Sequence, residues 1–161
     1  MVVGITGHQN LDDESAWIWV ADALRSALSE VPRPLIGISS LAIGADQLFA
    51  ELILAQGGAL RAVLPFPDYN ETFESEAHRD RYQALLTQAT HVEVLPTRET
   101  KQESYLAAGI HIVDISDRML AVWDGKRAAG LGGTGDVVLY VRRIGKPLLH
   151  IDPTRRETKS L

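Results

Sequence analysis

Short apolar runs alternate with helix-length amphipathic segments along this chain. The apolar runs cover 2–6, 35–39, 60–64, 91–95, 119–123 and 147–151. Apolar residues recur at helical spacing after a cap at Asp12 or Asp13, and again over 44–55, 71–89, 99–117 and 135–145. This alternation is typical of α/β domains in which helices connect parallel strands. We therefore predict an α/β fold with a mainly parallel sheet of about six strands.

Length and cysteine content define the class of protein further. With 161 residues and no linker, the chain is predicted to form one domain over 1–151, followed by a polar tail over 152–161 that is solvated and partly disordered. The absence of cysteine excludes disulfides and thiolate metal sites, and it is typical of a reducing cytoplasm. The first strand begins without a basic segment or an apolar run before it, so we expect no leader. No apolar run reaches the roughly 18 residues of a membrane span. We expect a soluble cytoplasmic protein with no membrane partner.

The charge balance bears on the kind of partner. The formal net charge is −5, and the basic residues form only short clusters, which argues against nucleic acid as the partner. An anionic small molecule remains compatible with this charge, because helix N-termini and loop amides supply local positive potential. We expect a small ligand, with no cofactor and no metal.

In open parallel sheets, ligands bind beyond the carboxyl ends of the strands. The residues that follow the predicted strands are therefore the candidates for a site. They are 6–10, 39–46, 65–68, 124–125 and 130–136.

The glycine-rich segment 130–136 is the strongest of these candidates. It reads Gly-Leu-Gly-Gly-Thr-Gly-Asp and lies between a predicted strand and a predicted helix. Backbone N–H groups can converge on an anion there, because glycine has no Cβ in the way. We predict that Gly132, Gly133, Thr134 and Gly135 bind a phosphate group. The alternative is that the segment is only a turn.

The first strand ends in a second turn of this kind, Thr6-Gly7-His8. A hydroxyl, a flexible amide and an imidazole suit a phosphate or a ribose. His8 also has the chemistry of a general acid or base. The alternative is that His8 and Gln9 only satisfy backbone groups of the loop.

A third crossing runs from Ser39 and Ser40 to Gly44 and Asp46. Hydroxyls at the end of the strand and a glycine at the start of the helix favour a ligand there. A phosphate beside the Asp46 carboxylate would be repelled, so we expect Asp46 to contact sugar hydroxyls or a base, and we favour the ribose. The alternative is a charge that only stabilises the start of the helix.

Other motifs carry less information. Trp123 either packs in the core or stacks on a base, and Arg79 or Arg81 either lies on a solvated helix face or reaches a ligand from a lid. No histidine and carboxylate spacing resembles a metal site. No motif for acyl transfer or ordinary ATP hydrolysis is present.

Three of these segments together resemble the SLOG superfamily. They are 3–8, 39–46 and 132–135, and 63–66 and 116–125 are also similar. This Rossmann-like group includes the LOG-type "lysine decarboxylase-like" proteins and DNA-processing protein A. The resemblance implies a single three-layer Rossmann-like domain. It also implies a nucleotide or nucleotide derivative bound by Thr6, Gly7, His8, Ser39, Ser40, Gly44, Asp46, Gly132, Gly133, Thr134 and Gly135.

The sequence departs from the LOG pattern where those enzymes carry catalytic residues. LOG enzymes cleave the N-glycosidic bond of nucleoside monophosphates, and their glycine motif continues into threonine and, three residues later, glutamate. Asp136 and Leu139 occupy these positions here. A leucine cannot activate water, so we favour nucleotide binding or sensing. The alternatives are an N-glycoside hydrolase that uses Asp46 or Asp136, and a nucleic-acid-binding module. We also expect a homo-oligomer.

Overall fold

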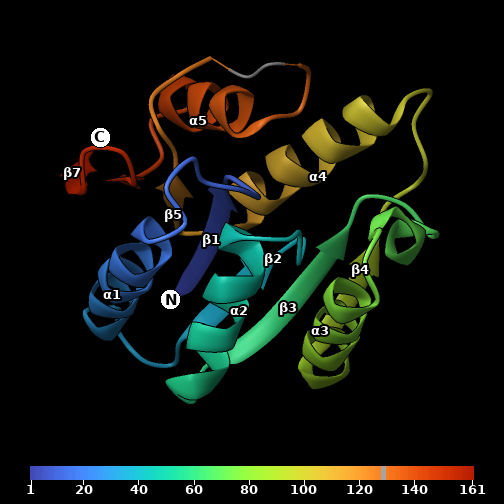
Figure 1. Cartoon of the computed structure of the whole chain (residues 1–161), viewed down its shortest axis with the longest axis horizontal. Coiled ribbons are helices and arrows are strands. Elements are labelled where there is room, and N and C mark those ends of the chain that lie inside the picture. The colour runs from blue at the N-terminus through green and yellow to red at the C-terminus, as the bar shows by residue number, and fades with distance from the viewer. Residues whose placement is uncertain (128–129) are drawn as a thin grey trace.

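Strands and α-helices alternate through the part of the chain that the structure, a computed structural model, describes, which is residues 1–127 and 130–161 (Figure 1). The strands β1 to β7 span Val2–Gly7, Ile36–Ser39, Ala59–Leu64, His91–Val94, Arg118–Val122, Leu148–Asp152 and Glu157–Ser160. The helices α1 to α5 span Ala16–Ser29, Ala45–Ala55, Glu76–Gln88, Lys101–Ile115 and Thr134–Arg143. A short 3-10 helix, η1, spans Tyr69–Thr72.

The strands form one sheet in the order β4-β3-β2-β1-β5-β6-β7. Every neighbouring pair is parallel except β6 and β7. The chain builds outward from β1 to β4, and α4 then carries it back to β5 on the other side of β1. The strand order therefore reverses between β1 and β5, whose carboxyl ends lie side by side, with Gly7 opposite Val122.

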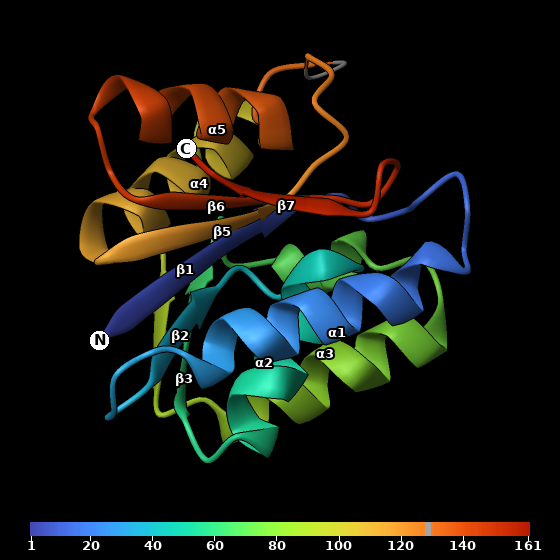
Figure 2. The same cartoon turned by 90° about the vertical axis from the view of Figure 1, so that its left-hand side faces the viewer.

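Helices cover both faces of the sheet, so the domain has three layers (Figure 2). Helices α1, α2 and α3 lie on one face, and α4 and α5 lie on the other. The side chains of β5 alternate between the two resulting cores. Leu120 and Val122 pack with α1 and α2, whereas Met119 and Ala121 pack with α4 and α5. The predicted α/β Rossmann-like fold with a mainly parallel sheet is confirmed.

The polar C-terminal segment contains a strand that the sequence analysis did not predict. Instead of a partly disordered end, Glu157–Ser160 forms β7 and pairs antiparallel with β6, from Leu149 opposite Ser160 to Asp152 opposite Glu157. The Asp152 carboxylate shapes the turn, since it accepts the N–H groups of Thr154 and Arg155 at 2.9 and 3.0 Å. Every side chain of β7 is exposed, so the strand carries no apolar pattern in the sequence.

The predicted helix over 71–89 is divided into two elements. Helix η1 ends at Thr72, Phe73 is buried in an extended conformation, and α3 begins only at Glu76. Ser75 caps α3, because its hydroxyl accepts the N–H of His78 at 3.1 Å. The other predicted elements lie where they were expected, with ends shifted by a few residues.

Candidate functional site

A cavity of about 730 Å³ opens at the point where the strand order reverses. It is lined from the carboxyl ends of β1, β2, β3 and β5 and from the sides of α4 and α5. This is the place where open parallel sheets bind ligands. Of the candidate residues, Ser39 and Gly44 lie outside the lining, which includes Thr6, Gly7, His8, Ser40, Asp46, Gly132, Gly133, Thr134 and Gly135.

The turn after β1 is fixed from both sides. The His8 N–H donates to the Val122 carbonyl at 3.0 Å, and the His8 carbonyl accepts the N–H of Ala45 at 3.1 Å. The His8 ring also contacts the loop after β5, since Nε2 lies 3.1 Å from Asp124 Oδ1 and accepts the Asp124 N–H at 3.2 Å. His8 therefore lines the cavity and also accepts a backbone N–H of the loop after β5. Satisfying backbone groups is the alternative role that the sequence analysis gave for this residue.

Asp124 is arranged to remain a carboxylate. Partial burial raises the pKa of Asp124, but the hydrogen bonds from the Lys126 N–H and from His8 together outweigh this effect. The pKa therefore lies below the ordinary value. The Lys126 Nζ lies 3.4 Å from Asp124 Oδ2. The loop after β5 therefore presents a matched set of charges at the rim of the cavity.

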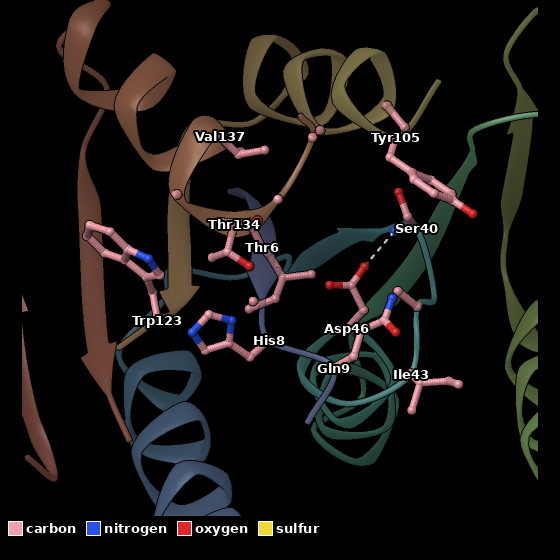
Figure 3. A pocket seen from close by; sticks show the side chains of 18 of the residues that line it. Thr6, His8, Gln9, Ser40, Ile43, Asp46, Tyr105, Trp123, Thr134 and Val137 are labelled. Carbon is pink, nitrogen blue, oxygen red and sulfur yellow. Dashed lines mark hydrogen bonds between the residues drawn. The ribbon is translucent and has the colours of Figure 1, made fainter. Parts of the chain in front are cut away.

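The crossing from β2 to α2 places one buried carboxylate in the cavity. Asp46 Oδ2 accepts the Ser39 hydroxyl and the Ser40 N–H, both at 3.1 Å. The Ala42 N–H is a further hydrogen-bond donor to this carboxylate, and Asp46 borders the cavity opposite Thr6, His8 and Thr134 (Figure 3). The Asp46 carboxylate can therefore accept a hydrogen bond from a ligand in the cavity.

Burial has a clear effect on Asp46. The residue is 6% exposed, and desolvation raises its pKa from 3.8 to about 6, although the hydrogen bonds from Ser39 and Ser40 act in the opposite direction. A carboxylate with this pKa is mostly ionised at neutral pH. It occupies the first turn of α2, so a phosphate at this helix N-terminus would meet a negative charge.

Ser39 and Gly44 support this crossing from outside the cavity. Ser39 is fully buried, and its hydroxyl donates a hydrogen bond to the Asp46 carboxylate. Gly44 has φ +86°, and a Cβ on it would come within 2.6 Å of the His8 carbonyl oxygen. Gly44 therefore allows α2 to approach the β1 turn. This close approach explains why residue 44 is a glycine, whereas the sequence analysis expected Gly44 to contact a ligand.

The glycine segment before α5 supplies backbone donors. Gly132 has φ +86°, and a Cβ on it would lie 2.6 Å from the Gln102 carbonyl oxygen, so the segment packs closely on α4. The Gly132 N–H donates to Asp136 Oδ2 at 2.9 Å. The N–H groups of Gly133, Thr134 and Gly135 have no acceptor among the described residues. At a helix start these groups point away from the helix, which makes them available to an anion.

Aromatic side chains that the sequence analysis did not assign to the site line the far side of the cavity. They are Tyr69, Phe73 and Tyr105. The Tyr69 ring contacts those of Phe73 and Tyr105, with centroid distances of 5.3 and 6.4 Å. Burial raises the pKa of Tyr69 well above its ordinary value, and the Asp46 charge adds to this effect. One signal pointed to this group: Tyr69 follows the segment 65–68, which was expected to border a site.

Several residues that were considered do not border the cavity. Arg81 instead binds Glu51 through two hydrogen bonds of 2.6 and 2.7 Å, and Arg79 donates to the Phe73 carbonyl at 2.7 Å. Leu139, which stands where LOG enzymes carry glutamate, is 57% exposed.

Trp123, by contrast, borders the cavity, and its indole N–H donates to the Lys126 carbonyl at 2.7 Å.

Two further searches concern the described residues alone. Within 1–127 and 130–161, no three histidine, aspartate or glutamate side chains come together as a metal site would require. Across the same residues, no helix combines the length and the apolar character needed to cross a membrane.

Fold and cavity define a Rossmann-like domain with a cavity at the switch point. No family model and no curated protein matches the sequence. Among solved structures, DNA processing protein A from Helicobacter pylori aligns over 96% of this chain and 70% of its own, with a TM-score of 0.67 and 16% identity. That structure is described as showing a single-stranded DNA binding mode.

Two other structures share the fold. DNA processing protein A from Streptococcus pneumoniae aligns over 92% of this chain at a TM-score of 0.63 and 15% identity, and this chain spans only 49% of that protein. The Moco carrier protein from Chlamydomonas rheinhardtii aligns over 92% of this chain and 74% of its own, at a TM-score of 0.54 and 15% identity. These similarities confirm the Rossmann-like fold that the sequence predicted.

Proposed function

We propose that this domain binds a nucleotide or nucleotide derivative in the switch-point cavity. The observation that supports this most directly concerns the N–H groups of Gly133, Thr134 and Gly135 at the start of α5, for which residues 1–127 and 130–161 provide no acceptor. They border a cavity large enough for a nucleotide, and they lie at the helix end where anions bind. In this proposal they hold the phosphate.

The remaining lining residues fit the other parts of such a ligand. Thr6, His8 and Thr134 lie on the same side of the cavity (Figure 3), and Thr134 is the first residue of α5, where the phosphate is proposed to bind. Asp46 and Ser40 lie across from them, and Tyr105 lies above Ser40. Because an ionised Asp46 can only accept hydrogen bonds, we assign its carboxylate to a donor group of the ligand, a ribose hydroxyl or a base N–H.

A second candidate function is hydrolysis of the N-glycosidic bond of a nucleoside monophosphate. The observation that favours it is the raised pKa of the buried Asp46, about 6, which suits proton transfer near neutral pH. Water would bond to the anomeric carbon while the bond to the base breaks, and Asp46 would pass the water proton to the departing base. Asp136 is less suited to this role, because it is not among the described residues that line the cavity.

Nucleic acid binding and assembly are separate questions. The DNA processing proteins share this fold, but the net charge of −5 argues against a strand as the principal ligand here. That the protein forms a homo-oligomer stays a prediction. Native mass spectrometry measures the oligomeric state in the same experiment that tests for a bound ligand.

That experiment is native mass spectrometry of gently purified protein, followed by incubation with nucleoside monophosphates and chromatography. We expect a bound nucleotide that is lost in Gly133→Val, and no release of free base. Release of base by the wild type that disappears in Asp46→Asn would establish the hydrolase instead. No bound nucleotide, together with no affinity for added nucleotides, would refute both functions.

A further inference from the structure

Asp136 places a negative charge next to the glycine segment that forms the proposed phosphate site. It is the third residue of α5, and its Oδ2 accepts the Gly132 N–H at 2.9 Å. Gly132 borders the cavity, so the Asp136 carboxylate is one residue removed from its lining. This interaction orders the glycine segment, and it withdraws one backbone donor from a ligand. It also opposes the positive end of the helix dipole that attracts an anion.

The other charged side chains around the cavity are of both signs. Lys126 is matched by Asp124, whose other oxygen faces His8. Asp46 adds a buried carboxylate on the far side. Arg127 is the further basic residue among the described lining. The three carboxylates of Asp46, Asp124 and Asp136 thus outnumber the two basic side chains of Lys126 and Arg127. The cavity combines backbone donors for an anion with an excess of carboxylates, which disfavours high negative charge.

We propose that Asp136 makes this cavity selective for a phosphate with a single negative charge, a phosphodiester, over a terminal phosphomonoester. A phosphomonoester carries about 1.5 to 2 negative charges at pH 7, whereas a diester carries one. Both groups offer oxygens to the N–H groups of residues 133–135, but the second charge of the monoester is repelled by Asp136. This inference rests on the proposed function and specifies the ligand class of the same site.

A diester can come from a small molecule or from a strand. A cyclic nucleotide or a dinucleotide has the same singly charged phosphate as single-stranded DNA. The cavity of about 730 Å³ accommodates a small nucleotide, and the net charge of the chain disfavours a long polyanion. The test therefore includes both sources of the diester.

The test is isothermal titration calorimetry at pH 7.5 with two matched pairs of probes. AMP is compared with its 5′-methyl ester, and GMP with its 5′-methyl ester, so that only the charge of the phosphate changes within a pair. For at least one base, we expect the wild type to bind the methyl ester about tenfold more tightly, which corresponds to about 1.4 kcal/mol. A wild type that binds the monoester equally well or better would overturn the inference.

The variant Asp136→Asn provides the second measurement. Its side-chain oxygen still accepts the Gly132 N–H, so the segment keeps its hydrogen bond while the charge is removed. We expect the preference for the ester to fall to within about threefold, because the monoester gains most. The control Asp80→Asn removes an equal charge from the exposed face of α3 and should leave the preference unchanged. A preference that survives in Asp136→Asn would overturn the assignment to Asp136.

The outcomes separate this inference from the proposed function. Equal binding of both members of a pair refutes the selectivity and leaves nucleotide binding established. Failure of all four probes and of a hexathymidylate to bind at millimolar concentration refutes the proposed function. Binding of hexathymidylate more tightly than either ester supports the diester selectivity and identifies a strand as its source. Should Asp136→Asn fail to fold, the wild-type comparison still decides the selectivity.

Discussion

Replacing Asp46 with asparagine is expected to stabilise the protein at neutral pH. Burial raises the pKa of Asp46 from 3.8 to about 6, so the folded state holds the charged form at a cost. The difference of about two pKa units corresponds to about 3 kcal/mol. Asparagine avoids this cost and still accepts the hydrogen bonds of Ser39 and Ser40 through its side-chain oxygen.

The sign of the pH dependence follows from linkage. A group whose pKa is higher in the folded state contributes stability that is fully present below its unfolded pKa and is lost as the pH rises through its folded pKa. For Asp46 this window runs from about pH 4 to above pH 6. The wild type should therefore lose stability relative to Asp46→Asn across this window, by about 3 kcal/mol in total.

Urea unfolding followed by tryptophan fluorescence measures this difference. The free energy of unfolding of both proteins is determined at pH 4, 5, 6 and 7, and the difference between them isolates residue 46. The control Asp80→Asn, on the exposed face of α3, should differ from the wild type by a constant amount. A difference between wild type and Asp46→Asn that does not change with pH would refute the argument from burial. The same variant should bind nucleotides about 1 to 3 kcal/mol more weakly, because a charge-assisted hydrogen bond is lost.

Three further predictions concern the site and its surroundings. Gly133→Val should abolish nucleotide binding in calorimetry while circular dichroism stays unchanged, because valine readily adopts the φ of −75° at this position and its side chain would crowd the proposed anion site. Unaltered affinity would contradict the role of the amides. EDTA should change nucleotide affinity by less than about twofold, and a loss beyond about tenfold, or 1.4 kcal/mol, would show that a metal ion takes part. Arg81→Met should cost less than about 1 kcal/mol of stability, since its pair with Glu51 is exposed, and should leave affinity unchanged. Weakened nucleotide binding in that variant would mean that α3 reaches the ligand after all.

The sequence predicted the sheet and much of the cavity for the same physical reason. Periodicity of apolar residues locates strands and helices locally, and the carboxyl ends of parallel strands must meet at one edge. The segments containing Thr6, Ser40, Asp46 and Thr134 were therefore correctly expected to lie close together. What each of these residues binds stays a prediction.

The sequence did not reveal which residues of a turn face inward. Ser39 and Ser40 are adjacent, yet only Ser40 borders the cavity, and Gly44 serves the approach of α2 to the β1 turn. The sequence analysis assigned Tyr105 to the buried stripe of its helix. Tyr105 also borders the cavity, because α4 connects β4 at the edge of the sheet to β5 on the other side of β1. Such placements depend on contacts between distant segments, which a single sequence does not encode locally.

One local signal was present and was not used. Thr100 and Glu103 form a capping box at the start of α4, in which each side chain accepts the other residue's N–H at 3.1 Å. Reading this pattern would have placed the start of α4 at Lys101, where the structure has it.

The central claim is that the amides at the start of α5 hold the phosphate of a nucleotide. Nuclear magnetic resonance of ¹⁵N-labelled protein tests it directly, by titration with AMP, GMP and their 5′-methyl esters. The account predicts that the amide resonances of Gly133, Thr134 and Gly135 show the largest shifts and saturate together with those of Thr6 and His8. Saturable binding whose shifts fall elsewhere on the domain, with these amides unmoved, would contradict it.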